Sequence, residues 1–234
     1  MRKLRSSIAS HSDILNAARS RDATNILLGG LHGHHLRPRA WTEFLTAATL
    51  RSLSQARAHP RPFLQVTALH LAIGLVADKR HRTWVATSWA LAVSHLGLLE
   101  AKQNLGLPNT ITLIRANLPA VEDRLGRWVP VLALISDFVD GKIARKTGAV
   151  TVFGDRADFL ADTALWTWFI VRHETSRRAT VCTFAVWAVP VAAISVASFA
   201  KGRMIDIPQL RWLRPSAAVE VFIGARVIQR LFIR

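Results

Sequence analysis

Four aspartates in the middle of the chain have the residue type and the spacing of a cation site. Asp137 and Asp140 are three positions apart, and Asp158 and Asp162 are four apart. On two helices, each pair would project from one face, because residues three and four apart are neighbours on a helix. Carboxylate oxygens are the ligands that Mg²⁺, Mn²⁺ and Ca²⁺ prefer, and close carboxylates repel one another unless cations or protons intervene. The sequence therefore predicts a divalent metal site between two opposed helices.

The same stretch carries small and basic residues at fixed positions between the aspartates. It reads D-x-x-D-G-x-x-A-R-x8-G-x-x-x-D-x-x-x-D, with the specified positions at Asp137, Asp140, Gly141, Ala144, Arg145, Gly154, Asp158 and Asp162. This pattern resembles the signature of the CDP-alcohol phosphatidyltransferase family (class I) at every specified position. The alternative from the residues alone is a hairpin of solvated acidic helix ends, which the apolar surroundings disfavour.

A second, looser likeness to that family precedes the acidic stretch. Pro108, Asn109, Thr112 and Arg115 match P-N-x-x-T-x-x-R, which opens the first core helix of the family. In an apolar helix, Arg115 needs an anion or a carbonyl as partner. The alternative is a side chain that snorkels to the membrane surface.

The resemblance implies an enzyme of phospholipid biosynthesis. It implies transfer of a phosphatidyl or similar substituted phosphate group from a CDP-linked alcohol, usually CDP-diacylglycerol, to the hydroxyl of a second alcohol, with release of CMP. One or two Mg²⁺ or Mn²⁺ ions are then held by Asp137, Asp140, Asp158 and Asp162, and Asp162 is also the expected general base. A planar arginine fork suits the donor phosphates, for which Arg145 is the expected contact.

The glycines and the alanine of the pattern have two interpretations. Gly141, Ala144 and Gly154 lack bulk where the nucleotide must approach the backbone, and they are therefore expected in the CDP site with Arg145. Small residues also allow close helix packing in a membrane bundle. Both interpretations stay open at this point.

The acceptor side is less specified. The candidate contacts for the acceptor or its phosphate are Asn109, Arg115, Arg156, Lys201 and Arg203. The last three are expected to form a basic pocket for an acceptor that carries its own phosphate, such as glycerol phosphate or inositol phosphate. Interfacial anchoring explains Lys201 and Arg203 equally well, and a neutral acceptor such as an amino alcohol also remains open.

Composition indicates a membrane protein. Half of the 234 residues are hydrophobic although 20% are charged, and the mean hydropathy is +0.22. The apolar residues come in blocks between short basic loops, which is typical of a polytopic helical protein. The net charge of +16 suits anionic lipids and a phosphate-bearing substrate, and the blocks disfavour nucleic acid as a partner. The single cysteine, Cys182, excludes an intramolecular disulfide.

The expected fold is an all-α polytopic membrane bundle of six or seven apolar helices, several of them shorter than the ~20 residues usually needed to span a bilayer. The candidate spans are Phe63 to Ala77, Trp84 to Leu99, Leu107 to Val121, Trp128 to about Ala144, Ala157 to Val171, Ala179 to Ala200, and Ser216 to about Phe232. Family members have six core helices beginning with the P-N-x-x-T helix. In this sequence, two apolar blocks precede that helix. Only two apolar blocks follow the two acidic helices, whereas three follow them in family members.

We divide the chain into a basic N-terminal region, residues 1–60, and a transmembrane catalytic domain, residues 61–234. Residues 41–58 have helical periodicity, with Trp41, Phe44, Leu45, Ala48 and Leu53 on one side and Arg51 among the polar positions. Interfacial binding and packing on the protein's own helices are both open for this amphipathic helix. A metal site at His32, His34 and His35 is less expected than a polar loop.

The basic N-terminal end favours a cytoplasmic amino terminus and, with it, an active site that faces the cytoplasm. Membrane lipids are expected partners, and so is a second copy of the chain as a homodimer. Two other functions remain alternatives: a catalytically inactive lipid-binding scaffold, and a cation transporter that uses the same carboxylate cluster. Intact Asp162 and Arg145 disfavour the scaffold, whereas the glycines, Arg145 and the position of the acidic residues at helix ends disfavour the transporter.

Overall fold

The computed structural model describes residues 11–148, 150–174, 176–205 and 229, and every regular element within these residues is helical. The α-helices are α1 (His11–Asn16), α2 (Ser20–Gly33), α3 (Pro38–Ala58), α4 (Pro60–Val76), α5 (Arg82–Ser94), α6 (Leu107–Ala116), α7 (Glu122–Leu125), α8 (Val129–Thr147), α9 (Val152–His173) and α10 (Arg177–Lys201). Short 3-10 turns are η1 (Lys79–His81), η2 (Leu96–Leu99), η3 (Leu118–Val121) and η4 (Gly126–Trp128). The predicted all-α class is confirmed.

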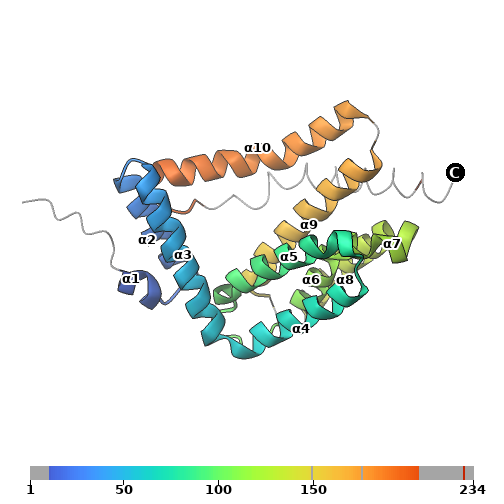
Figure 1. Ribbon diagram of the computed structural model, residues 1–234, viewed down its shortest axis with the longest axis horizontal. Coiled ribbons are helices and arrows are strands. Elements are labelled where there is room, and N and C mark those ends of the chain that lie inside the picture. The colour runs from blue at the N-terminus through green and yellow to red at the C-terminus, as the bar shows by residue number, and fades with distance from the viewer. Residues whose placement is uncertain (1–10, 149, 175, 206–228, 230–234) are drawn as a thin grey trace, which may run out of the picture.

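Helix α6 is the centre of the arrangement, because α8 and α9 both pack along it. The α4–α5 hairpin lies beside these helices, and α10 runs from the end of α9 back to α2 (Figure 1). Helix α3 joins the N-terminal helices to the α4–α5 hairpin.

Helix α9 contributes to two of the buried apolar clusters that hold the helices together. Near its start, Phe153 packs with residues of α4, α5, η2 and α6. Near its end, Phe169 packs with Val129 and Ala133 of α8 and with Leu118 of η3. Phe153 and Phe169 are at most 1% exposed, and full burial of such a side chain stabilises a fold by about 1.5–3 kcal/mol. The apolar surface of α9 therefore sets its position against the other helices.

Among the predicted apolar blocks that the structure describes, two do not form a single helix: Trp84 to Leu99, where α5 ends at Ser94 before η2, and Leu107 to Val121. Helix α6 ends at Ala116, and the 3-10 turn η3 follows from Leu118. Pro119 explains the break, because proline lacks a backbone N–H and disfavours helical geometry in the residue before it. With 10 residues, α6 is about 15 Å long, which is too short to cross a bilayer.

Of the described helices, only α10 is both long enough and apolar enough to cross a membrane. The predicted count of six or seven spans is therefore not confirmed. The candidate span from Ser216 to Phe232 lies outside the described residues, apart from Gln229.

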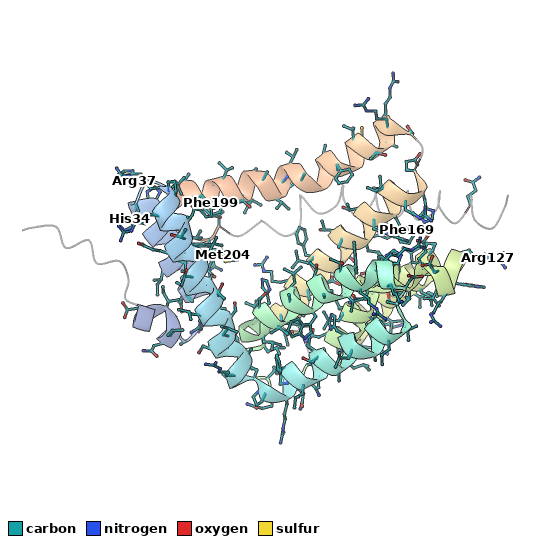
Figure 2. The ribbon with its side chains drawn as sticks, in the orientation of Figure 1. His34, Arg37, Arg127, Phe169, Phe199 and Met204 are labelled. Carbon is teal, nitrogen blue, oxygen red and sulfur yellow. The ribbon has the colours of Figure 1, made fainter. Side chains whose placement is uncertain are left out.

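The three N-terminal helices pack on one another, and α2 and α3 also contact the end of α10. The ring of Trp41 on α3 lies 5.4 Å from that of Phe199 on α10, centroid to centroid. The backbone N–H of Met204 donates to Asn25 Oδ1 at 2.8 Å. Figure 2 shows Phe199 and Met204 beside the N-terminal helices, far from Phe169. The predicted apolar face of α3 thus packs on the protein itself at Trp41.

One prediction for α3 is wrong: Arg51 does not occupy an outward polar position. Its side chain is buried and donates to the carbonyl oxygens of Ile14 at 3.0 Å and Ala17 at 2.7 Å. The last carbonyls of a helix have no partner within the helix, and Arg51 supplies one for α1. Leu45 and Leu53 of the predicted apolar face are instead more than half exposed.

A glycine at position 154 allows the close contact between α9 and α6. The buried Asn109 side chain donates from Nδ2 to the Leu105 carbonyl at 2.6 Å and to Thr151 Oγ1 at 3.2 Å. Thr151 caps α9 by accepting from the Gly154 N–H at 2.9 Å. A Cβ at position 154 would lie 2.6 Å from Asn109 Oδ1. Close helix packing is therefore an observed reason for this glycine, whereas its contact with a nucleotide stays a prediction.

We predict that Gly154→Ala lowers the free energy of unfolding by about 1–3 kcal/mol, the usual cost of inserting a methyl group into a tight contact. Thermal unfolding in detergent measures the change. Gly30→Ala is the matched control, because no atom lies within 4 Å of the added Cβ in α2. Alanine favours a helix over glycine, so the control should be neutral or slightly stabilised. Equal unfolding temperatures for the two variants would contradict the packing role of Gly154.

Candidate metal centre

Three of the four predicted aspartates meet where α8 and α9 pack along α6. Asp137 comes from α8, and Asp158 and Asp162 lie one turn apart on α9. One carboxylate oxygen from each lies within 4.8 Å of the others. The side chains of Asp140, Ala144 and Arg145 lie outside the described part of the structure.

Arg115 of α6 reaches into this group of carboxylates. Its Nη1 donates to Asp137 Oδ1 at 2.8 Å, and its Nη2 donates to Asp158 Oδ1. The same Nη2 lies 3.2 Å from Asp162 Oδ1. The Arg115 side chain is only 1% exposed, so it does not snorkel to a surface. One buried guanidinium thus bridges carboxylates from two helices.

The three carboxylates differ in their access to solvent. The side chains of Asp137 and Asp158 are 52% and 44% exposed, whereas that of Asp162 is 16% exposed. With all three ionised, the guanidinium balances one of their charges. Among the described side chains, this leaves two negative charges, which one divalent cation would neutralise.

The residues present fit a divalent cation. All the donor atoms are hard carboxylate oxygens, which Mg²⁺, Mn²⁺ and Ca²⁺ prefer. Ligands on opposite sides of a Mg²⁺ ion lie about 4.2 Å apart, and around Ca²⁺ about 5 Å. The three oxygens lie within 4.8 Å of one another, so one cation could draw them together, and their partial exposure leaves an approach open.

The other predicted site residues lie at different places. Gly141 follows Asp137 by one turn on α8. Asn109 is engaged in the contact between α6 and α9 and lies outside the carboxylate group.

The predicted basic pocket of Arg156, Lys201 and Arg203 is not formed. All three side chains are exposed. Arg156 lies in the first turns of α9, whereas α10 leads Lys201 and Arg203 away to α2 (Figure 1). Lys201 and Arg203 lie away from Arg156 because the end of α10 packs on the N-terminal helices. The apolar pattern of α10 does not predict this contact.

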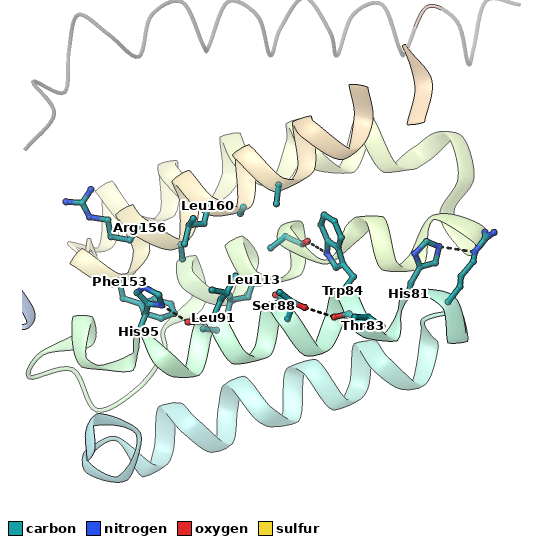
Figure 3. A pocket seen from close by; sticks show the side chains of 17 residues that line it. His81, Thr83, Trp84, Ser88, Leu91, His95, Leu113, Phe153, Arg156 and Leu160 are labelled. Atoms are coloured by element: carbon teal, nitrogen blue, oxygen red, sulfur yellow. Dashed lines mark hydrogen bonds between the residues drawn. The ribbon is translucent and has the colours of Figure 1, made fainter. Parts of the chain in front are cut away.

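Two cavities near the site were not anticipated from the sequence. One, of about 420 Å³, borders Arg115 and is lined mostly by apolar residues, among them Ile114 of α6 and Ile135 of α8. The other, of about 490 Å³, lies between α5, α6 and α9, with Leu91 and Leu160 on opposite sides (Figure 3). Asp158 and Asp162 do not line this second cavity. The alanines at 157, 161 and 164 are the sequence signal for it, because small residues on one helix face leave space beside a neighbour.

A comparison with protein-family models agrees with the resemblance in the acidic stretch. The model of the CDP-alcohol phosphatidyltransferase family matches residues 105–228, more than half of the chain. The matched range contains Arg115 and all four aspartates of the pattern, whereas α1 to α5 precede it. The chain has no significant match among curated proteins or among solved structures. On the strength of the family match, which covers the helices that carry the carboxylates, this chain belongs to the CDP-alcohol phosphatidyltransferase family.

Proposed function

We propose that this protein moves a phosphatidyl or similar substituted phosphate group from a CDP-linked lipid, such as CDP-diacylglycerol, to the hydroxyl of a second alcohol. Its place would be in phospholipid biosynthesis. Membership in the family supports transfer from a CDP-alcohol. The observation that carries the proposal is the meeting of Asp137, Asp158 and Asp162 around Arg115.

In the proposed reaction, the acceptor oxygen forms a bond to the phosphorus that carries the lipid. The bond from that phosphorus to the bridging oxygen of the pyrophosphate breaks, and CMP leaves with that oxygen. Asp162 takes the proton of the acceptor hydroxyl. It is the least exposed of the three carboxylates. Bulk water therefore has less access to Asp162 and competes less with the acceptor hydroxyl for it.

Asp137, Asp158 and Asp162, together with Asp140, would hold one or two Mg²⁺ or Mn²⁺ ions. When bound, a divalent cation neutralises the phosphates of the donor and stabilises the leaving group. Gly141, Ala144, Arg145 and Gly154 keep their proposed place beside the CDP group, where the fork of Arg145 would contact phosphate.

A lipid donor needs an apolar surface beside the polar site. The cavity of about 420 Å³ that borders Arg115 offers one, and its volume lies in the range of small-molecule sites. We place the hydrophobic part of the donor there. Family membership also implies an integral membrane protein, which the apolar helix α10 supports. We propose that the site faces the cytoplasm.

The acceptor is proposed only as a small polar alcohol. Asn109 and Arg115 are engaged in contacts within the fold, and the cavity that Arg156 lines does not include Lys201 or Arg203. These positions therefore give no preference for a phosphorylated acceptor over a neutral one.

Asp162→Asn should lower CMP release by at least about a hundredfold, the lower range for loss of a general base. The assay uses purified protein in detergent with Mg²⁺ or Mn²⁺, CDP-diacylglycerol and a panel of alcohols. Asp155→Asn is the matched control, since Asp155 is an exposed carboxylate in the first turn of the same helix. Unchanged CMP release by Asp162→Asn would exclude the proposed role, and no CMP from the natural sequence with any acceptor would exclude the activity.

Saturating Mn²⁺ should raise the unfolding temperature of the protein, because a ligand that binds the folded state stabilises it. The gain is about 2.7 kcal/mol at a hundred times the dissociation constant. Asp158→Asn should reduce this gain, whereas Asp155→Asn should retain it. An equal gain in both variants would show that the metal binds elsewhere.

A further inference from the structure

We infer that Arg115 and the divalent cation compete for the same carboxylates, so that metal binding displaces the guanidinium from them. This rests on the proposed function, because it takes Asp137, Asp158 and Asp162 as the metal ligands. It assigns Arg115 a role toward the metal in addition to its candidate contact with phosphate.

The first argument is geometric. The carboxylate oxygens that lie within 4.8 Å of one another belong to the three residues that Arg115 contacts. The guanidinium therefore lies where a cation would have to bind to contact all three. Each carboxylate can accept more than one partner, but the ion and the guanidinium both carry positive charge and would be only a few ångström apart.

The second argument is electrostatic. Like charges at such separations repel strongly where the surroundings are partly buried. Arg115 cannot relieve this repulsion by losing its proton, because an arginine stays charged in proteins. It has to move away or weaken the binding of the metal. In either case, Arg115 opposes the metal.

The third argument concerns space and attachment. Arg115 is almost fully buried, but it borders the cavity of about 420 Å³, which gives the displaced side chain room beside its present position as long as no lipid donor occupies that cavity. Meanwhile its ion pairs link α8 and α9 through α6. The guanidinium thus serves as an internal counter-charge that keeps the carboxylates together and then gives way to the metal.

Competition and a purely structural role predict different results for Arg115→Gln. Both roles predict a lower unfolding temperature without metal, because three carboxylates lose their buried partner. Only competition predicts that the variant binds metal more tightly than the natural sequence. The combination of lower stability and higher metal affinity therefore identifies competition.

The experiment measures Mn²⁺ binding to the full-length protein in detergent by the electron paramagnetic resonance signal of free Mn²⁺, without any substrate. We expect Arg115→Gln to bind Mn²⁺ about tenfold more tightly or better, since one nearby positive charge is removed. Arg115→Lys, which keeps the charge, should bind less tightly than Arg115→Gln. Arg51→Gln is the matched control: it removes another buried arginine, whose hydrogen bonds within the described residues go to backbone carbonyls in and just after α1, and should leave Mn²⁺ affinity unchanged. Equal or weaker Mn²⁺ binding by Arg115→Gln would overturn the inference.

A second measurement needs no variant, in case Arg115→Gln does not fold. Phenylglyoxal modifies accessible arginines, and mass spectrometry of peptides locates the modified residues. In the natural sequence, saturating Mn²⁺ should increase modification of Arg115 and leave Arg51 protected. Unchanged protection of Arg115 would overturn the displacement.

The failure of this inference can be told apart from failure of the proposed function. Metal-dependent CMP release by the natural sequence, without tighter Mn²⁺ binding by Arg115→Gln, would reject the competition and leave the activity standing. Absence of both CMP release and Mn²⁺ binding in the natural sequence would reject both.

Discussion

The ion pairs of Arg115 are the interaction on which the arrangement of this site depends. A single guanidinium from α6 contacts carboxylates of α8 and α9, and these two helices pack along α6. Leaving such a buried charge without its partner costs about 3–5 kcal/mol, so the carboxylates and the arginine constrain each other. Three mutually repelling carboxylates can converge here because a positive charge lies among them.

Helix α9 carries candidate metal-site carboxylates, apolar core residues and a close glycine contact, and these lie on different parts of its surface. Asp158 and Asp162 point to Arg115, while Phe153 and Phe169 belong to separate apolar clusters near its two ends. Gly154 brings its first turn against Asn109 of α6. Because both the apolar residues and the close glycine contact fix the rotation of the helix, the direction of the two aspartates follows from packing as well as from their own ion pairs.

That Asp158 and Asp162 share a helix face could be predicted from their spacing once the apolar block indicated a helix, because residues four apart are neighbours on a helix whatever surrounds them. The partner of Arg115 could be predicted only by type, as an anion or a carbonyl. Spacing within one segment does not tell which segment lies opposite. The same limit explains Arg51, which looks like a surface residue until α1 is placed beside it, and Lys201, whose location depends on where the far end of α10 packs.

The segment before the family match packs on the two helices, α6 and α9, that carry Arg115 and two of the aspartates. Val66 of α4 and Ala92 of α5 share an apolar cluster with Leu113 of α6 and Phe153 of α9, although the matched range begins at residue 105. These contacts cover faces of α6 and α9 that do not carry Arg115 or the aspartates. A 10-residue helix such as α6 has little stability of its own, yet it must hold a buried charge in place. The α4–α5 hairpin and η2 add to the packing that α8 and α9 provide for α6, so residues before the family match contribute to the position of its carboxylates.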